Sequence, residues 1–172
     1  KKEVFLTCES GGTLEFHIEP VLPMIKLIIY GDTPTAFALA NIGSYLNYNC
    51  IICSTDTVDG KKLSEKVNIV KNFKSFSGNC AIVIATQGKN DVEALKSALS
   101  SKPNFISMII SRKKAVSITR QLKKLGISDD EVRKIKFPAG LSINAKTPEE
   151  IAISILAELI NERNSEDKNE QT

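Results

Sequence analysis

Residues 25–36 read IKLIIYGDTPTA and join an apolar run to a polar turn and the start of a helix. An unbroken apolar run such as Ile25–Tyr30 is typical of a strand that is covered on both faces of a sheet. Gly31 permits a tight turn after this run, and residues 34–46 then show helical spacing of their apolar side chains. The segment therefore predicts a strand, a glycine turn and a helix in direct succession.

The same succession of strand and helix continues along the chain. The further expected strands are 48–53, 67–70, 80–85 and 105–110, and the further expected helices are 60–65, 91–99, 113–125, 129–135 and 147–161. Repeated strand–helix–strand units with buried strands favour a parallel sheet with helices on both faces. We therefore expect an α/β protein with a three-layer Rossmann-like fold and the strand order 3-2-1-4-5.

These patterns divide the chain into one main domain and two short ends. Residues 1–24 alternate in polarity around a Ser-Gly-Gly turn, which predicts a β-hairpin and a connector. Residues 25–163 are the Rossmann-like domain, and residues 164–172, which contain no apolar residue, are expected to be a flexible tail. Because the chain opens on Lys1 rather than Met, we expect a truncation of a longer protein.

Composition and length are those of an ordinary globular protein. The chain has 172 residues, of which 42 % are hydrophobic and 25 % are charged, and this excludes a disordered or collagen-like chain. No apolar run reaches the ~20 residues that a membrane span needs, and no signal peptide is visible. Four cysteines are too few for a secreted disulfide framework, so we expect a cytoplasmic protein without a membrane span.

Cys50-Ile-Ile-Cys53 has the spacing of a redox motif but lies within an expected strand. Residues three apart in a strand point to opposite faces and lie ~10 Å apart, beyond the ~7 Å limit for a disulfide. We therefore interpret both cysteines as buried structural thiols. The only histidine, His17, lies between two glutamates on a polar strand face, which indicates a surface strand rather than a metal site.

The glycine turn occupies the phosphate site of dinucleotide-binding domains, whose fingerprint is G-x-G-x-x-G/A. Gly31 and Ala36 match the first and third small residues of that pattern, but Thr33 replaces the middle glycine. We interpret Thr33 as the N-cap of the helix, with Pro34 removing one amide donor. Asp32 adds a negative charge beside the helix N-terminus, and these changes together disfavour a conventional dinucleotide at this turn.

A ribose-binding acid is expected at the end of the second strand, and the match there is weak. Ser54 ends that strand, and Asp56 follows two residues later. A further stretch, residues 138–145, contains Gly140 in an expected tight loop, which could close over the same edge of the sheet.

A second candidate site is Ser111-Arg112-Lys113-Lys114, which follows an expected strand and opens a helix. Exposed cations at a helix N-terminus are unfavourable by roughly 0.3–1 kcal/mol each. An anion bound between Arg112 and the free amides would explain them; the alternative is that the long side chains point into solvent. Residues 111–136 contain nine basic and three acidic residues in a chain of net charge +3. A basic surface attracts phosphates or acidic partners.

The C-terminal half contains motifs that resemble a known family. The runs ISRKK (110–114), GIS (126–128), PAGL (138–141) and TPEEIAISILAE (147–158) resemble GSRRK, GFSEEDL, PIGLDIGA and TPEEIAVSILAEI of the xanthine dehydrogenase accessory factor family (XdhC/CoxI). CESGG (8–12) and IEP (18–20) resemble the end of that family's separate N-terminal domain. The resemblance runs from Cys8 to about Arg163 and implies the family's C-terminal Rossmann domain.

Departures from the family pattern cluster at the ligand edge of the expected sheet. The family's GAGHVA is replaced by GDTPTA at residues 31–36, its second-strand acid falls on Ser54, and its TH pair falls on Thr86-Gln87. Its glycine before SRRK falls on Ile110, and the aspartate and glycine of GLDIG fall on Ser142 and Asn144. We therefore expect a divergent member with an altered or lost ligand site. The expected cofactor-binding residues are Gly31, Asp32, Thr33, Ala36, Ser54, Asp56, Thr86, Ser111, Arg112, Lys113 and Gly140.

The resemblance implies an accessory and maturation factor for a molybdenum hydroxylase of the xanthine or CO dehydrogenase type. Such proteins are associated with holding molybdenum cofactor (molybdopterin) and with its sulfuration and insertion, so the hydroxylase and cofactor-assembly proteins are the expected partners. No catalytic acid–base pair stands out, so a binding protein is expected rather than an enzyme.

Two alternatives stay open at this point. One is an NAD(P)-dependent oxidoreductase, which rests on the fold alone. The other is a non-catalytic subunit that binds a protein through its basic surface. No nucleic-acid partner is expected, since no recognition motif accompanies the basic residues; whether the chain forms a homodimer is open as well.

Overall fold

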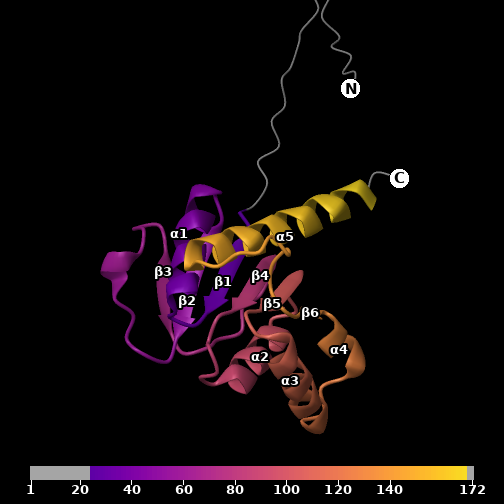
Figure 1. Cartoon of the computed structure of the whole chain (residues 1–172). Coiled ribbons are helices and arrows are strands. Elements are labelled where there is room, and N and C mark those ends of the chain that lie inside the picture. The colour runs from indigo at the N-terminus through magenta and orange to yellow at the C-terminus, as the bar shows by residue number, and fades with distance from the viewer. Residues whose placement is uncertain (1–23, 170–172) are drawn as a thin grey trace, which may run out of the picture.

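The computed structural model describes residues 24–169, in which one sheet lies between two layers of helices (Figure 1). Neighbouring strands are parallel throughout, and their order is β3-β2-β1-β4-β5-β6. The expected α/β Rossmann-like fold with the order 3-2-1-4-5 is confirmed, and a sixth strand is added at one edge. The strands are β1 (Lys26–Tyr30), β2 (Asn49–Ser54), β3 (Asn68–Lys71), β4 (Cys80–Ile84), β5 (Phe105–Met108) and β6 (Ile135–Lys136).

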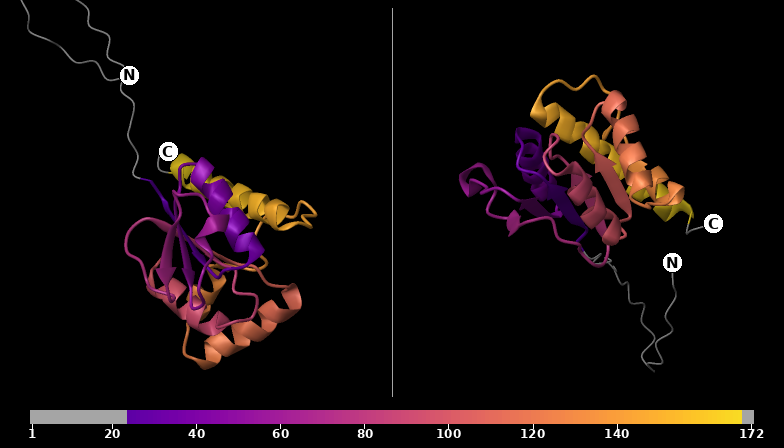
Figure 2. Two further views of the ribbon diagram at one scale, coloured as in Figure 1. Left: turned by 90° about the vertical axis from the view of Figure 1, so that its left-hand side faces the viewer. Right: turned by 90° about the horizontal axis from the view of Figure 1, so that it is seen from below.

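The helices divide between the two faces of the sheet, as Figure 2 shows. Helices α1 (Pro34–Tyr45) and α5 (Pro148–Asn169) lie side by side on one face. Helices α2 (Asp91–Ser100), α3 (Arg112–Lys124) and α4 (Asp129–Arg133) cover the other face, and a single turn of 3-10 helix, η1 (Gly60–Lys62), precedes β3. No helix within residues 24–169 combines the length and the apolar character that crossing a bilayer requires.

Side chains of the central strand β1 alternate between two hydrophobic cores. Leu27 and Ile29 pack under α1 and α5, whereas Ile28 and Tyr30 pack under α2 and α3. All four side chains are fully buried, because both faces of a parallel sheet are covered by its crossover helices. The apolar run at residues 27–30 is therefore explained by burial on both sides.

Cys50 and Cys53 of β2 belong to opposite cores, as the strand spacing predicts. Both are free thiols and are fully buried. Burial raises the pKa of each thiol from 9.0 to about 12, since an ionised sulfur is poorly solvated in an apolar core. The interpretation of both residues as structural thiols is confirmed.

Gly31 lets the chain leave β1 between the ends of two flanking strands. Its φ of +124° is in the region that favours glycine. The Gly31 amide donates to the Cys53 carbonyl at 2.9 Å, and the Ala85 amide donates to the Tyr30 carbonyl at 2.7 Å. A β-carbon on Gly31 would stand 2.7 Å from the Ala85 carbonyl carbon, so only glycine fits between these two strand ends.

Most elements lie within one residue of their expected bounds, β5 ends at Met108 rather than at residue 110, and three helices differ more clearly. Helix α4 ends at Arg133 rather than at residue 135, because Ile135 pairs with β5 as part of the short edge strand β6. The 3-10 turn η1 covers only part of the expected helix 60–65. Helix α5 runs to Asn169, past the expected end at Asn161 and into the segment expected to be a tail, since no Gly or Pro interrupts it. The expected N-terminal hairpin, with His17, lies outside the described residues.

We predict that Gly31→Ala lowers the free energy of unfolding by more than Gly126→Ala does. Both glycines have positive φ, and a non-glycine residue there costs about 1–3 kcal/mol. A β-carbon on Gly31 also meets backbone, whereas one on Gly126 has nothing within 4 Å. Urea unfolding followed by circular dichroism measures both losses. Equal losses at the two positions would contradict the packing argument.

Cys50 and Cys53 should resist alkylation in the folded protein and react fully in urea. Their folded pKa lies above that of the unfolded thiol, so the associated stabilisation is complete below pH 9 and declines between pH 9 and about 12. Peptide mass spectrometry after iodoacetamide treatment at pH 8 reports the modification of each cysteine. Rapid modification of either residue without unfolding would show that its thiol is accessible.

Candidate functional site

The turn between β1 and α1 is closed by hydrogen bonds among its own residues. Thr33 is the N-cap of α1, and its Oγ1 accepts from the Ala36 amide at 3.2 Å. Pro34 follows at the first helical position, where it has no amide proton. The Ser54 hydroxyl at the end of β2 donates to the Asp32 carboxylate at 3.1 Å. The structure thus brings together Gly31, Asp32, Thr33, Ala36 and Ser54. Two of the donors there, the Ala36 amide and the Ser54 hydroxyl, already donate to side chains of the turn itself.

Asp56 lies just beyond this cluster and is exposed. Its amide donates to the Ser54 hydroxyl at 3.0 Å, and its carboxylate forms an ion pair of 3.2 Å with Lys89. Both side chains of that pair are more than half exposed, so the pair contributes little stability. Asp56 is therefore near the turn without facing a pocket with it.

A groove of about 550 Å³, which we call the edge groove, lies at the carboxyl ends of β4 and β5. Of the residues predicted from sequence, Ser111, Arg112 and Gly140 line it, and Lys113 does not. Thr86 is buried beside it and donates from Oγ1 to the Asp91 carboxylate. The second candidate stretch and the loop 138–145 are therefore walls of one groove.

The loop 138–145 is held on α5 by hydrogen bonds to its backbone. Gly140 has a φ of +91°, and a β-carbon there would stand 3.2 Å from the Ile155 amide nitrogen. The Gly140 amide donates to Glu158 Oε2 at 2.8 Å, and Leu141 donates to the Ser154 carbonyl at 3.1 Å. The wall of the edge groove is thus positioned from helix α5.

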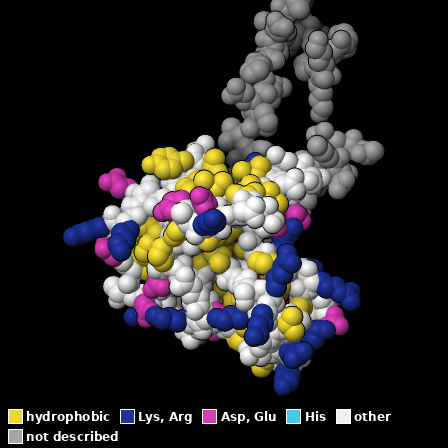
Figure 3. All heavy atoms as spheres, viewed as in Figure 1, with side chains coloured by type: hydrophobic (Ala, Val, Ile, Leu, Met, Phe, Trp, Pro, Cys, Tyr) yellow, Lys and Arg dark blue, Asp and Glu magenta, His cyan; other side chains and the backbone are white. Residues whose placement is uncertain are grey.

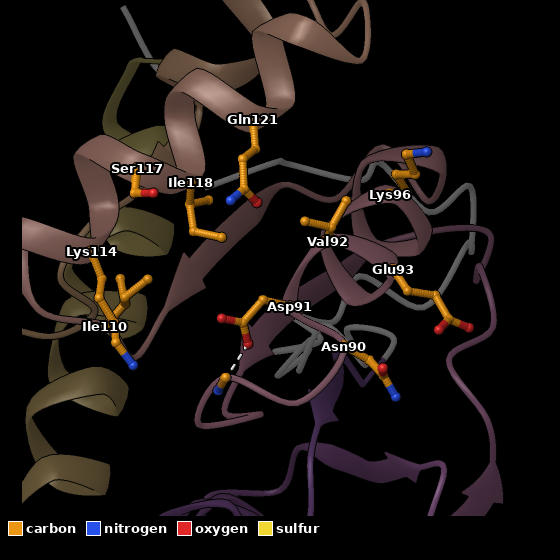
Figure 4. Close-up of a pocket in the computed structure, with 11 residues that line it drawn as sticks. Asn90, Asp91, Val92, Glu93, Lys96, Ile110, Lys114, Ser117, Ile118 and Gln121 are labelled. Atoms are coloured by element: carbon orange, nitrogen blue, oxygen red, sulfur yellow. Dashed lines mark hydrogen bonds between the residues drawn. The ribbon is translucent and has the colours of Figure 1, made fainter.

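A second groove of about 730 Å³, the helix groove, lies between α2 and α3 (Figure 4). It adjoins the edge groove, because both are lined by Gly88, Asp91, Ile110 and Lys114. Asp91 Oδ1 accepts from the Gly88 amide at 3.1 Å and from Thr86. The two grooves form one continuous depression along the edge of the sheet.

Positive charge dominates α3, the helix that contributes lining residues to both grooves. Figure 3 shows Lys and Arg side chains gathered over α3 and α4. Ser111 caps α3 by accepting from the Lys114 amide at 3.4 Å. Lys123 pairs with Asp129 at 2.7 Å, whereas Arg112 forms no ion pair within residues 24–169. An unpaired guanidinium beside first-turn amides suits a bound anion.

Asp91 and Gln121 of the helix groove were not predicted from sequence, and Lys114 belonged to the candidate stretch 111–114 but not to the expected cofactor-binding residues. Asp91 opens its helix three residues after Gly88, and an acid in the first turn of a helix is a visible sequence signal because it complements the helix dipole. Gln121 gave no signal, because its position depends on how α3 packs against α2. No group of three metal-binding side chains occurs within the residues described.

Comparison with known proteins agrees with the motifs of the C-terminal half. A family model described as the XdhC Rossmann domain matches residues 27–159. The chain belongs to the XdhC family. The match extends from β1 into α5, so it includes the turn and both grooves.

Relatives of this XdhC-family chain are similar at low identity. It is 24 % identical over 161 residues to a protein of Bacillus subtilis (strain 168) named as a probable subunit of xanthine dehydrogenase, across 88 % of this chain and 47 % of that protein. It is 22 % identical over 142 residues to the molybdenum cofactor insertion chaperone PaoD of Escherichia coli (strain K12), across 82 % of this chain and 41 % of that protein.

A solved structure, described as a xanthine dehydrogenase from Bacillus halodurans, superposes with a TM-score of 0.69. The identity is 26 %, and the match covers 83 % of this chain and 44 % of that one. An 84-residue stretch is also 34 % identical to an uncharacterised Escherichia coli (strain K12) protein, YqeB, across 49 % of this chain and 15 % of that protein. The XdhC-family chain thus spans less than half the length of these relatives.

We predict that Glu158→Ala speeds hydrogen exchange at the Gly140 amide, and that Glu158→Gln does so much less. A hydrogen bond to a charged group is worth about 1.5–3 kcal/mol, so its loss should raise local exchange roughly tenfold or more. The glutamine retains an oxygen that can accept from Gly140. Deuterium exchange of the peptide covering 138–145 measures the effect, and unchanged exchange in Glu158→Ala would show that the loop is held by other contacts.

Proposed function

We propose that this XdhC-family chain contains the cofactor-binding domain of an accessory factor that holds molybdenum cofactor for insertion into a molybdenum hydroxylase in the cytoplasm. The observation that carries the proposal is the edge groove, where Ser111 and Arg112 stand at the start of α3. Family membership supports it, as do relatives named as a molybdenum cofactor insertion chaperone and a probable subunit of xanthine dehydrogenase.

The donor set of the edge groove fits the phosphate group of the cofactor. The first amides of a helix point away from it without an internal partner, and the helix dipole favours negative charge there. Arg112 adds a planar fork of N–H donors, which matches phosphate oxygens. In this proposal Arg112 and the first-turn amides of α3 hold the phosphate, while the pterin lies in the adjoining helix groove.

The first turn fits a dinucleotide poorly, and the oxidoreductase alternative gains no support from it. Both helices have an N-cap hydroxyl that accepts from a first-turn amide, Thr33 on α1 and Ser111 on α3, so the two turns differ in their other residues. Pro34 supplies no amide, and Asp32 adds negative charge beside the helix N-terminus. Phosphate binding is therefore assigned to α3 rather than to α1.

The proposal predicts that Arg112→Ala weakens binding of molybdenum cofactor by roughly 10–100-fold. Loss of a hydrogen bond to a charged group costs about 1.5–3 kcal/mol. Lys113→Ala is the matched control, because it removes the adjacent cation, which lines neither groove. Bound pterin is measured by its fluorescence after oxidation, without interference from tryptophan, which the chain lacks.

Insertion itself is tested by adding the loaded chain to a molybdenum hydroxylase produced without cofactor. Recovery of hydroxylase activity, reduced in Arg112→Ala but not in Lys113→Ala, is the expected result. A chain that retains no pterin and restores no activity would overturn the proposed function.

A further inference from the structure

Asp91 presents a fixed carboxylate to the helix groove. It opens α2, and its side chain is half-buried. The Gly88 amide and the Thr86 hydroxyl both donate to Oδ1. No residue between 24 and 165 donates to Oδ2, and Figure 4 shows this oxygen directed across the groove toward the α3 side. A carboxylate has about four lone-pair sites, so two remain for a ligand on Oδ2.

The walls beside this carboxylate combine an apolar part with two polar side chains of α3, Ser117 and Gln121. Val92 of α2 and Ile118 of α3 face the groove from opposite sides in Figure 4, and Ile110 lies below them. A slot with apolar walls and a few fixed polar groups suits a flat ring whose edge is hydrogen-bonded. The ligand edge must donate protons, because Oδ2 can only accept.

Lys114 of α3 faces the Asp91 carboxylate from the other side of the groove. The Lys114 ammonium lies 4.0 Å from the point where a β-carbon on Gly88 would stand, at the junction with the edge groove. It forms no ion pair with Asp91 or with any other acid among the described residues. A ligand that satisfies both side chains carries adjacent N–H donors on a ring, which meet Asp91, and a negative group, which meets Lys114.

We propose that the helix groove binds the 2-amino-4-oxopyrimidine ring that pterins and guanine share, with Asp91 as the residue that selects it. This ring has an amino group beside a ring N–H, and both point in one direction, so Oδ2 accepts from both. Lys114 then meets the phosphate end of the same ligand. The identity of the natural ligand rests on the proposed function. Asp91 is added here as the residue that recognises the ring, through the edge that carries its amino group and ring N–H.

Replacing Asp91 by Asn tests this assignment by a change of preference rather than a simple loss. The Gly88 amide and the Thr86 hydroxyl both donate, so they hold the amide oxygen of the new side chain. Its NH₂ group then faces the groove. A donor there no longer matches a 2-amino group and instead matches a 2-oxo group, as in xanthine among purines and lumazine among pteridines.

Calorimetry on the full chain with guanosine, inosine and xanthosine monophosphates measures the affinity for purine rings that differ at position 2. Neopterin monophosphate and the matching lumazine give the same comparison for pteridine rings. Their affinities, set beside those of the purines, show whether pterin or guanine is preferred. The unmodified chain should bind the 2-amino ligands at least ten times more tightly than the 2-oxo ligands or inosine monophosphate, because a buried acceptor left unpaired is costly. Asp91→Asn should reverse the preference between 2-amino and 2-oxo rings.

Glu93→Gln is the matched control. It makes the same chemical change on the same helix, and although Glu93 also lines the groove, its carboxylate points away from Asp91 in Figure 4. The control should retain the preference of the unmodified chain. Circular dichroism of both variants distinguishes a change of selectivity from a loss of folding. The ligand series on the unmodified chain tests the preference for 2-amino rings without any variant.

Equal affinity for the five kinds of ring, no binding of any of them, or an unchanged preference in Asp91→Asn would overturn the inference. These results differ from failure of the proposed function. A chain that selects 2-amino rings through Asp91 but never restores a hydroxylase would overturn the function alone. A chain that restores the hydroxylase equally well with Asp91→Asn, and shows no ring preference, would overturn the inference alone.

Discussion

The fold depends on how the chain leaves its central strand. Strand β1 is hydrogen-bonded to β2 on one side and to β4 on the other, so its end is enclosed by two neighbours. Gly31 passes between them with its amide on the Cys53 carbonyl and its α-carbon against Ala85. The later crossovers add parallel strands on both sides of β1. The carboxyl ends of all the strands therefore meet at one edge.

Along that edge, the polar groups that are open to a ligand do not lie at the point where the strand order reverses. At the reversal, between β1 and β4, Thr33, Asp32 and Ser54 are held by hydrogen bonds within the turn and to the end of β2. One strand further along, the groups that face outward include a carboxylate oxygen, an ammonium and a guanidinium with no ion partner among the described residues. The scaffold is that of a dinucleotide-binding domain, while its open polar groups stand between α2, α3 and the loop 138–145.

The sequence was sufficient to predict the sheet, because buried parallel strands leave long apolar runs and most of the helices begin at a recognisable cap. It was also sufficient for the closed turn, since Thr33 and Pro34 act within a few residues of chain. It was insufficient for contacts made between distant elements. The bond from Gly140 to Glu158 joins residues 18 positions apart, and the helix groove exists only where α2 and α3 pack together. The two-residue strand β6 is too short to leave a period in the sequence.

The lengths of the two outer strands have a consequence for how the sheet meets other chains. An unpaired strand edge is a template for intermolecular pairing, and proteins protect such edges by keeping them short and placing lysines on them. Strand β3 has four residues and ends in Lys71, while β6 has two and ends in Lys136. Parallel sheets form slowly because their contacts are non-local. Both borders of this sheet are therefore poor seeds for aggregation during the interval in which the central strands are still assembling.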